Sequence, residues 1–138
     1  MDALRNTLAG YTPLSDYASA NLKRTISHII GNKLRQRPKE SEHPFFAYVP
    51  SGETLRRLTN TEYESKSQVY IVYGIHEKDI SLATQKVLDL SELIKECLRS
   101  DYTLGGAVAM AYPTRLETDE GYYQPFFYAR MLVEILEV

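Results

Sequence analysis

The sequence contains one cysteine, Cys97, and no tryptophan. A single cysteine cannot form an intrachain disulfide, and it cannot by itself hold a structural zinc ion. No stretch approaches the run of about 20 apolar residues that crosses a bilayer, and the first residues lack the apolar core of a signal peptide. We therefore expect no membrane interaction and a chain that is made and kept in the cytosol.

The motifs of common catalytic and cofactor sites are also missing. The sequence has no G-x-S-x-G motif, and its three histidines are never spaced as metal ligands. Gly105-Gly106 follows a predicted helix and precedes a predicted strand, which is the reverse of a phosphate-binding turn. Glu117, Asp119 and Glu120 lie close together without the ligand spacing of an EF-hand. We expect a protein that is not an enzyme and that binds no cofactor and no metal.

Length and composition fit one ordinary globular domain. The chain has 138 residues, of which 43% are hydrophobic and 25% are charged. A chain of this size buries roughly two-thirds of its unfolded surface without disulfides or metal. We predict a single domain over 1–138, with an N-terminal helical region at 1–43 and an α+β core at 44–138.

Charges are unevenly distributed along the chain. No acid lies between Asp16 and Glu40, whereas from Glu117 onward five acids accompany one base. The basic residues of the first stretch are Lys23, Arg24, Lys33, Arg35, Arg37 and Lys39. Opposed patches of this kind suit head-to-tail self-association. A basic helix over 23–39 also fits a small nucleic-acid-binding module, which is the alternative from another functional class.

The first half of the chain predicts two helices, a strand and a long connection. The first eight residues favour a short helix, and apolar residues at helical spacing predict a long helix over much of 13–36, with Gly31-Asn32 as an alternative, earlier end. The apolar run at 45–49, bounded by prolines, is typical of a short strand near a sheet edge, and a turn follows at 50–52. Residues 53–66 have little apolar periodicity, so we predict a long exposed connection there.

The second half predicts a strand and a helix first. Alternating apolar residues indicate a strand over 68–76. Asp79 or Ser81 can then cap a helix whose apolar residues recur every three or four positions. The segment 101–106 ends that helix, because its two glycines permit a positive φ.

The chain ends in two predicted strands. Residues 107–112 and 126–136 read as the strands of an antiparallel hairpin. The whole order is helix, strand, loop, strand, helix, strand, strand. It favours the α+β class: an antiparallel sheet of about four strands, two main helices packed on one face, and long hairpin or loop arms.

Tyrosine is over-represented, with eleven residues. Its side chain suits surfaces that are buried on association, since one end is apolar and the other forms hydrogen bonds. Tyr122, Tyr123 and Phe126 lie beside the predicted hairpin tip, and Tyr63 lies in the predicted connection. Burial within the chain is hard to arrange at these places, so we predict that these residues lie at an interface. Sheet edges left free would also invite pairing with another chain.

From about Phe45 to the C-terminus, the sequence resembles the tail terminator (tail completion) proteins of tailed bacteriophages. The resemblance rests on the predicted order of elements, with Arg56, Arg57 and Tyr63 in the loop between the first two strands. Its most specific piece is the Asp-Tyr-Thr-Leu-Gly-Gly junction at 101–106. The region before the first strand is longer than the compact family pattern.

The resemblance implies a structural virion protein made in the host cytoplasm. Its subunits would form a hexameric ring on the last ring of the tail tube, end tube polymerisation and join the tail to the neck or head-completion proteins. DNA would pass through the ring without sequence-specific binding. The longer N-terminal region leaves a head–tail adaptor or stopper of the neck as an alternative. The residues expected at interfaces are Arg56, Arg57, Tyr63, Asp101, Thr103, Gly105, Gly106, Tyr122, Tyr123 and Phe126.

Overall fold

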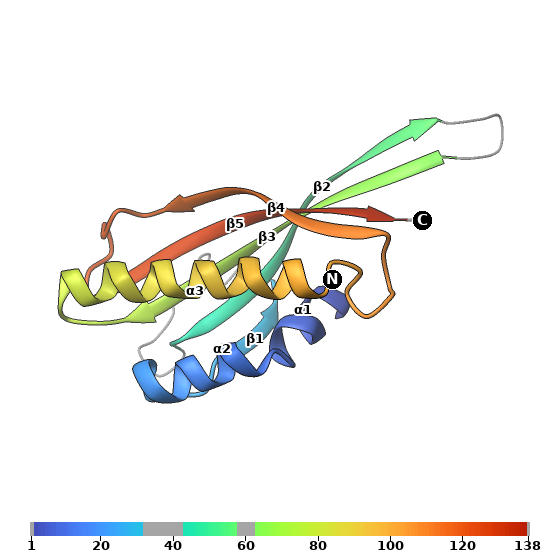
Figure 1. Cartoon of the computed structure of the whole chain (residues 1–138). Helices are drawn as coiled ribbons and strands as arrows, with labels where there is room; N and C mark the ends of the chain where they lie inside the picture. The colour runs from blue at the N-terminus through green and yellow to red at the C-terminus, as the bar shows by residue number, and fades with distance from the viewer. Residues whose placement is uncertain (1, 32–42, 58–62, 138) are drawn as a thin grey trace.

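A computed structural model describes residues 2–31, 43–57 and 63–137 (Figure 1). Short helices and one short strand come first, followed by two long strands, a long helix and a final pair of strands. In chain order the elements are α1 (Asp2–Ala9), α2 (Thr12–Tyr17), the π-helical turn η1 (Ala18–Leu22), β1 (Ser27–Ile30), β2 (Phe45–Arg57), β3 (Tyr63–His76), α3 (Ile80–Ser100), β4 (Met110–Thr118) and β5 (Phe126–Glu137).

The described strands form one sheet of five strands in the order β1-β2-β3-β5-β4. β1 pairs with β2 in parallel, and the other three pairs are antiparallel. The expected α+β class is therefore confirmed. The strand that the sequence did not reveal is β1, which forms one edge of the sheet, and β4 forms the other edge.

The helices lie on one side of the sheet (Figure 1). Leu8 and Leu14 of the N-terminal helices and Ile94 of α3 belong to the same buried cluster as Tyr73 of β3 and Met131 of β5. The N-terminal region thus shares a core with the strands. Burial of these apolar side chains is the main force that holds the two layers together.

α3 begins and packs as the sequence predicts. The Asp79 carboxylate accepts hydrogen bonds from the backbone N–H groups of Ser81 and Leu82 at 2.9 and 3.2 Å, so Asp79 is the N-cap. The buried face of the helix comprises Ala83, Val87, Leu90, Ser91, Ile94, Cys97 and Leu98. In the described part of the chain, no helix has the length and hydropathy needed to cross a membrane.

The short helix in the first eight residues is confirmed, but the long helix over 13–36 is wrong beyond Leu22. Lys23 takes a left-handed φ of 61°, which ends the helix. Residues 27–30 then form β1 rather than helix, because this stretch contains β-branched isoleucines that suit a strand. Residues 32–36 of the predicted helix lie outside the described residues.

β2 and β3 are much longer than predicted, and their far ends project from the sheet as a two-stranded ribbon (Figure 1). The predicted turn at 50–52 is wrong: it is a bulge inside β2, where the register shifts. Most of the predicted connection is also strand, because 53–57 pair with 63–67. We call residues 51–57 and 63–67 the arm; residues 65–67 at its base also pair with β5, and the two-stranded part lies beyond them. Residues 58–62 lie outside the described residues.

The terminal hairpin is confirmed, although its first strand is shifted. β4 begins at Met110 instead of residue 107 and continues to Thr118. The earlier residues are held in turns, in which the Val108 N–H donates to the Thr103 carbonyl at 3.1 Å. Residues 119–125 join β4 to β5, and we call them the tip.

Candidate interaction surfaces

A charge network fixes the root of the arm. The Lys66 ammonium lies 2.7 Å from Glu134 Oε2, which also accepts a hydrogen bond of 2.9 Å from the Tyr112 hydroxyl. The Gln68 side chain donates to Glu134 Oε1 at 3.3 Å. Hydrogen bonds from Lys66 and Tyr112 lower the pKa of Glu134. The network joins β3, β4 and β5 at the place where the arm leaves the sheet.

Beyond its root, the arm is exposed and polar. Residues 51–54 are exposed, and the Ser65 hydroxyl donates to the Glu53 carboxylate at 2.6 Å. β1 pairs only with Phe45–Tyr48, so residues 49–54 of β2 have no strand on that side within the described chain. A backbone edge of this kind pairs readily with a strand of another molecule.

The structure places three of the predicted interface residues in the arm. Arg57 and Tyr63 are partners in the strand register, one step from the pair formed by Arg56 and Glu64. The Arg57 side chain is exposed. For Arg56 and Tyr63 the structure describes the backbone but not the side chain.

Four further predicted interface residues form a turn with hydrogen bonds among themselves. Asp101 Oδ1 accepts from the Gly105 N–H at 3.0 Å and from the Thr103 hydroxyl at 3.4 Å. Thr103 Oγ1 accepts from the Gly106 N–H at 3.2 Å. Gly105 and Gly106 have φ values of 73° and 89°, which favour glycine. These four residues fix the shape of the turn. The side chain that the turn exposes to solvent is that of Tyr102, which is 52% exposed.

At the tip, two tyrosines face solvent and the phenylalanine does not. Tyr122 is 80% exposed and Tyr123 is 47% exposed, and their rings meet edge to face with centroids 4.9 Å apart. Phe126 is half-buried: its ring centroid lies 4.8 Å from that of His43 and 5.1 Å from that of His76. Tyr122 and Tyr123 are therefore available to a partner, whereas Phe126 packs within the chain.

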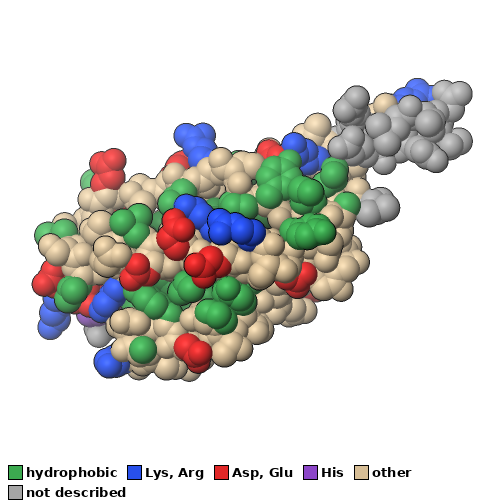
Figure 2. All heavy atoms as spheres, in the orientation of Figure 1, with side chains coloured by type: hydrophobic (Ala, Val, Ile, Leu, Met, Phe, Trp, Pro, Cys, Tyr) green, Lys and Arg blue, Asp and Glu red, His purple; other side chains and the backbone are tan. Residues whose placement is uncertain are grey.

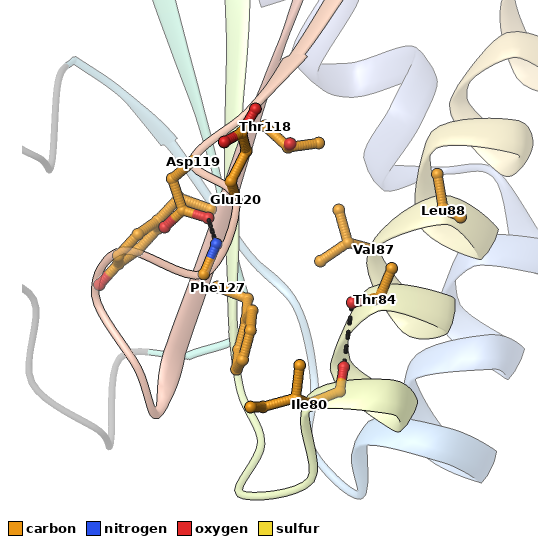
Figure 3. Close-up of a pocket in the computed structure, with 10 residues that line it drawn as sticks. Ile80, Thr84, Val87, Leu88, Thr118, Asp119, Glu120 and Phe127 are labelled. Atoms are coloured by element: carbon orange, nitrogen blue, oxygen red, sulfur yellow. Dashed lines mark hydrogen bonds between the residues drawn. The ribbon is translucent and has the colours of Figure 1, made fainter.

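A small pocket separates the tip from α3 (Figure 3). Ile80, Thr84 and Leu88 line it from α3, opposite Asp119 and Glu120. Its volume is about 150 Å³, enough for one side chain. One Asp119 oxygen accepts the Gly121 N–H at 3.0 Å, and the other is buried with no hydrogen-bond partner among the described residues.

A wider groove lies at the other end of β4. Its volume is about 350 Å³, and its walls are mostly apolar. The lining residues are Lys95, Leu98, Arg99, Tyr102, Met110, Ala111, Tyr112 and Pro113. Hydrophobic side chains gather near the root of the arm on this face, with basic side chains beside them (Figure 2). The sequence analysis missed this groove, because its residues come from three separate segments.

Burial shifts the pKa of two titratable groups that pack against the core. His28 Nδ1 lies 2.7 Å from the Tyr48 hydroxyl, and burial, aided by the nearby Arg5 cation, lowers the pKa of His28 to about 4. Burial raises the pKa of the Cys97 thiol to about 11. Among the residues that the structure describes, no group of three or more potential metal ligands comes together. Neither His28 nor Cys97 is among the lining residues of the pocket beside α3 or of the groove.

No protein-family model matches the sequence, and no curated protein matches it. A functional argument for this chain therefore rests on the surfaces described above. They are the arm, the tip and the groove. All three lie at the ends of β-strands. Neither His28 nor Cys97 belongs to any of them.

Proposed function

We propose that the chain is a structural subunit that assembles into a ring at the head-proximal end of a phage tail. In that position the ring would end tail-tube polymerisation and join the tail to the neck. The observation that carries the proposal is the arm, which extends well beyond the sheet and the helices (Figure 1). The resemblance of residues 45–138 to tail terminator proteins gives the proposal its specific form.

The arm supports a role outside its own subunit because it contributes little to the core. Its exposed residues are polar, and its outer backbone edge is open at 49–54 within the described chain. Extending two strands into solvent orders many residues without burying apolar surface, which is unfavourable in an isolated monomer. Contacts with another molecule would offset that cost.

In this proposal the arm and the tip make the axial contacts, one with the tail tube and the other with a neck or head-completion protein. The ring is a homo-oligomer, expected to be hexameric. DNA passes through its centre without sequence-specific binding. A head–tail adaptor or stopper would use the same surfaces, and the experiment below separates these roles.

The structure weakens the case for a nucleic-acid-binding helix. Residues 27–30 are strand, so no continuous helix spans 23–39. Lys23 and Arg24 are exposed, but they lie on a short connection between η1 and β1. Steep salt dependence of DNA or RNA binding by the purified protein would revive this alternative.

The deciding experiment is electron microscopy of lysates from a phage in which this gene is disrupted, with a complemented strain as the control. Overlong tails without heads are the expected result. Free tails of normal length beside leaking heads would instead indicate a stopper or adaptor. Unchanged virions would contradict the proposal.

A further inference from the structure

Two surfaces with complementary chemistry lie at opposite ends of β4. The groove, beside the start of β4, is apolar with a basic rim. The tip, after the end of β4, is acidic and carries exposed aromatic rings. Both surfaces expose apolar or aromatic side chains to water. This exposure is unfavourable in an isolated chain, because transfer of such groups out of water lowers the free energy.

The groove holds both an apolar floor and excess positive charge. Leu98 is buried at its base, while Tyr102 is 52% and Met110 44% exposed. Arg99 is exposed and forms no ion pair with another described residue. Among the described residues, Lys95 is paired only with Glu92 on the same helix, at 2.9 Å. Exposed pairs of this kind contribute little, so the Lys95 charge is available to a stronger partner.

The tip presents the opposite chemistry. Glu120 is exposed, has a φ of 56° and forms no ion pair with another described residue. Gly121 follows with a φ of 78°, and the Tyr122 N–H donates to the Asp119 carbonyl at 3.1 Å. This tight turn leaves the Tyr122 side chain 80% exposed, the most exposed of the large hydrophobic side chains described.

The two surfaces cannot meet within one chain. β4 has nine residues, which corresponds to about 30 Å at the usual rise per residue of a strand. An intermolecular contact between unlike surfaces is heterologous, so each subunit still has one free tip and one free groove after pairing. Such contacts propagate, and they close into a ring when the rotation between neighbours allows it.

The edge of β4 itself is poorly suited to adding a strand. The Ala111 N–H already donates to the Tyr102 carbonyl at 2.7 Å, and Pro113 has no N–H. The register also shifts between Pro113 and Arg115. Proline and bulges at an edge are typical ways to prevent strand pairing. A partner at this side of the molecule therefore docks through side chains.

We propose that the tip of one copy of this chain docks into the groove of the next copy. Tyr122 enters the groove beside Tyr102 and Met110, and Glu120 faces Arg99 and Lys95. The partner is a second copy because the chain carries both halves of the contact, matched in charge and in apolar character. The contact between tip and groove stands without the proposed function. Only the closure of the linked subunits into a ring rests on that function.

Charge reversal tests the pairing of Glu120 with Arg99. In low salt, R99E and E120K should each weaken self-association on the order of 100-fold, because each places like charges together. R99E/E120K in one chain should restore most of it, since position 99 and position 120 then carry opposite charges again and only the unchanged Lys95 faces a like charge. Asp16 of α2 is exposed and distant from β4 in sequence, so D16K is the matched control and should associate as the wild type does. Sedimentation velocity measures all four variants.

Mixing the two single variants gives a sharper test. R99E keeps a normal tip and E120K keeps a normal groove, so these two surfaces pair. The other contact brings the glutamate introduced by R99E opposite the lysine introduced by E120K, which again places opposite charges together. The expected product is an alternating assembly larger than either variant forms alone. A mixture that associates no better than the single variants, or the same association in all variants, would overturn the proposal.

A thiol-specific cross-link keeps the test decisive if association of the free chain is weak. At high protein concentration, a short bis-maleimide should link R99C/E120C into a ladder of oligomers. R99C alone and E120C alone should stay monomeric, and their mixture should give a single dimer band. The native Cys97 is buried with a raised pKa, so the wild-type chain should not react. Absence of the ladder would overturn the proposal.

The outcomes separate this interface from the proposed function. Oligomers that form equally well in every charge variant would remove the tip-to-groove contact and leave the tail role standing. A ladder from R99C/E120C together with unchanged virions after gene disruption would retain the contact and remove the tail role. Tyr122→Ala should weaken association about tenfold, as expected for an aromatic anchor at an interface.

Discussion

The body of the sheet and the arm are built from the same two strands, yet they are held in different ways. In the body, Phe46 and Tyr48 of β2 and Ile71 and Tyr73 of β3 are buried beneath the helices. In the arm, residues 51–54 are exposed, and the strands are joined by backbone pairing and by contacts such as Ser65 to Glu53. Packing therefore stabilises the body, whereas the arm depends on its hydrogen bonds and on the network at its root.

This difference assigns separate roles to the two regions. A buried core tolerates little change, because interiors are close-packed. An exposed polar ribbon can be altered without loss of the fold, so its length and order are better explained by contacts with another molecule. Substitutions in the two regions should consequently separate stability from assembly.

The largest effect is expected in the body. Ile71→Ala removes a fully buried side chain from the core cluster and should lower the free energy of unfolding by about 2–5 kcal/mol. Thr54→Ala in the arm is the matched control, because Thr54 is exposed on the same pair of strands, and it should change stability by less than about 0.5 kcal/mol. Urea denaturation measures both. Equal losses would show that the arm is part of the cooperative core.

The body should also show a pH dependence that the arm lacks. Burial lowers the pKa of His28 from 6.5 to about 4. Between pH 6.5 and pH 4, His28 is protonated in the unfolded chain and neutral in the folded chain. The free energy of unfolding that is present above pH 6.5 is therefore lost as pH falls toward 4. The loss should be on the order of 2 kcal/mol after allowance for partial exposure.

His28→Gln removes the titrating group and retains a side chain that can bond to the Tyr48 hydroxyl. The free energy of unfolding of this variant should vary less between pH 6.5 and 4.5 than that of the wild type. Denaturation at several pH values provides the comparison. Parallel curves for the two proteins would mean that another group causes the pH dependence.

The same contrast explains which parts of the fold the sequence could predict. α3, the body half of β3 and the terminal hairpin were predicted, because one face of each is apolar and follows the period of a helix or strand. The sequence predicts a loop in place of the arm, since its polar residues 53–57 lack that alternation. The sequence predicts helix in place of β1, because apolar residues at 26, 29 and 30 also fit helical spacing. Only the pairing of β1 with β2 decides between helix and strand.

The candidate surfaces were predictable only where they are local in sequence. Tyr122 and Tyr123 follow a turn signal, so their exposure at the tip could be anticipated. The groove could not, because Arg99 of α3, Tyr102 of the turn and Met110 of β4 meet only after the chain reverses direction. The sequence wrongly predicts an exposed Phe126, because the His43 and His76 rings that it contacts are far from it in sequence.

Shortening the arm should have a moderate effect on stability and a large effect on assembly. Leu55 and Ser65 are partners in the ladder, so replacing residues 56–64 by Asn-Gly joins them through a two-residue turn that suits a hairpin and leaves Lys66 in place. The free energy of unfolding should fall by no more than about 1 kcal/mol, because exposed contacts contribute little.

The shortened protein should nevertheless fail to complement a phage that lacks the gene, since the proposed axial contact is gone. Thermal denaturation and a plaque assay measure the two properties on the same variant. A loss of stability as large as that of Ile71→Ala would instead place the arm within the folding core. Full complementation would remove the arm from the proposed contacts.

The smallest effect is expected at the root of the arm. Hydrogen bonds from Lys66 and Tyr112 lower the pKa of Glu134 from its ordinary value, so its contribution is present at neutral pH and is lost as pH falls through the lowered pKa. Glu134→Gln should be slightly less stable than the wild type at pH 7, and the difference should shrink near pH 3. Glu92→Gln, which breaks the exposed pair with Lys95, is the control and should show no difference.

Hydrogen exchange should locate the loss in Glu134→Gln. If the network serves the arm, the amides of residues 65–68 should exchange faster in the variant, while those of Ile71 and Tyr73 keep their protection. Because β3 runs without interruption from the arm into the body, this boundary tests whether one strand can belong to two regions of different stability. Faster exchange along the whole strand would mean that the network stabilises the sheet as a unit, and that the arm and the body open together.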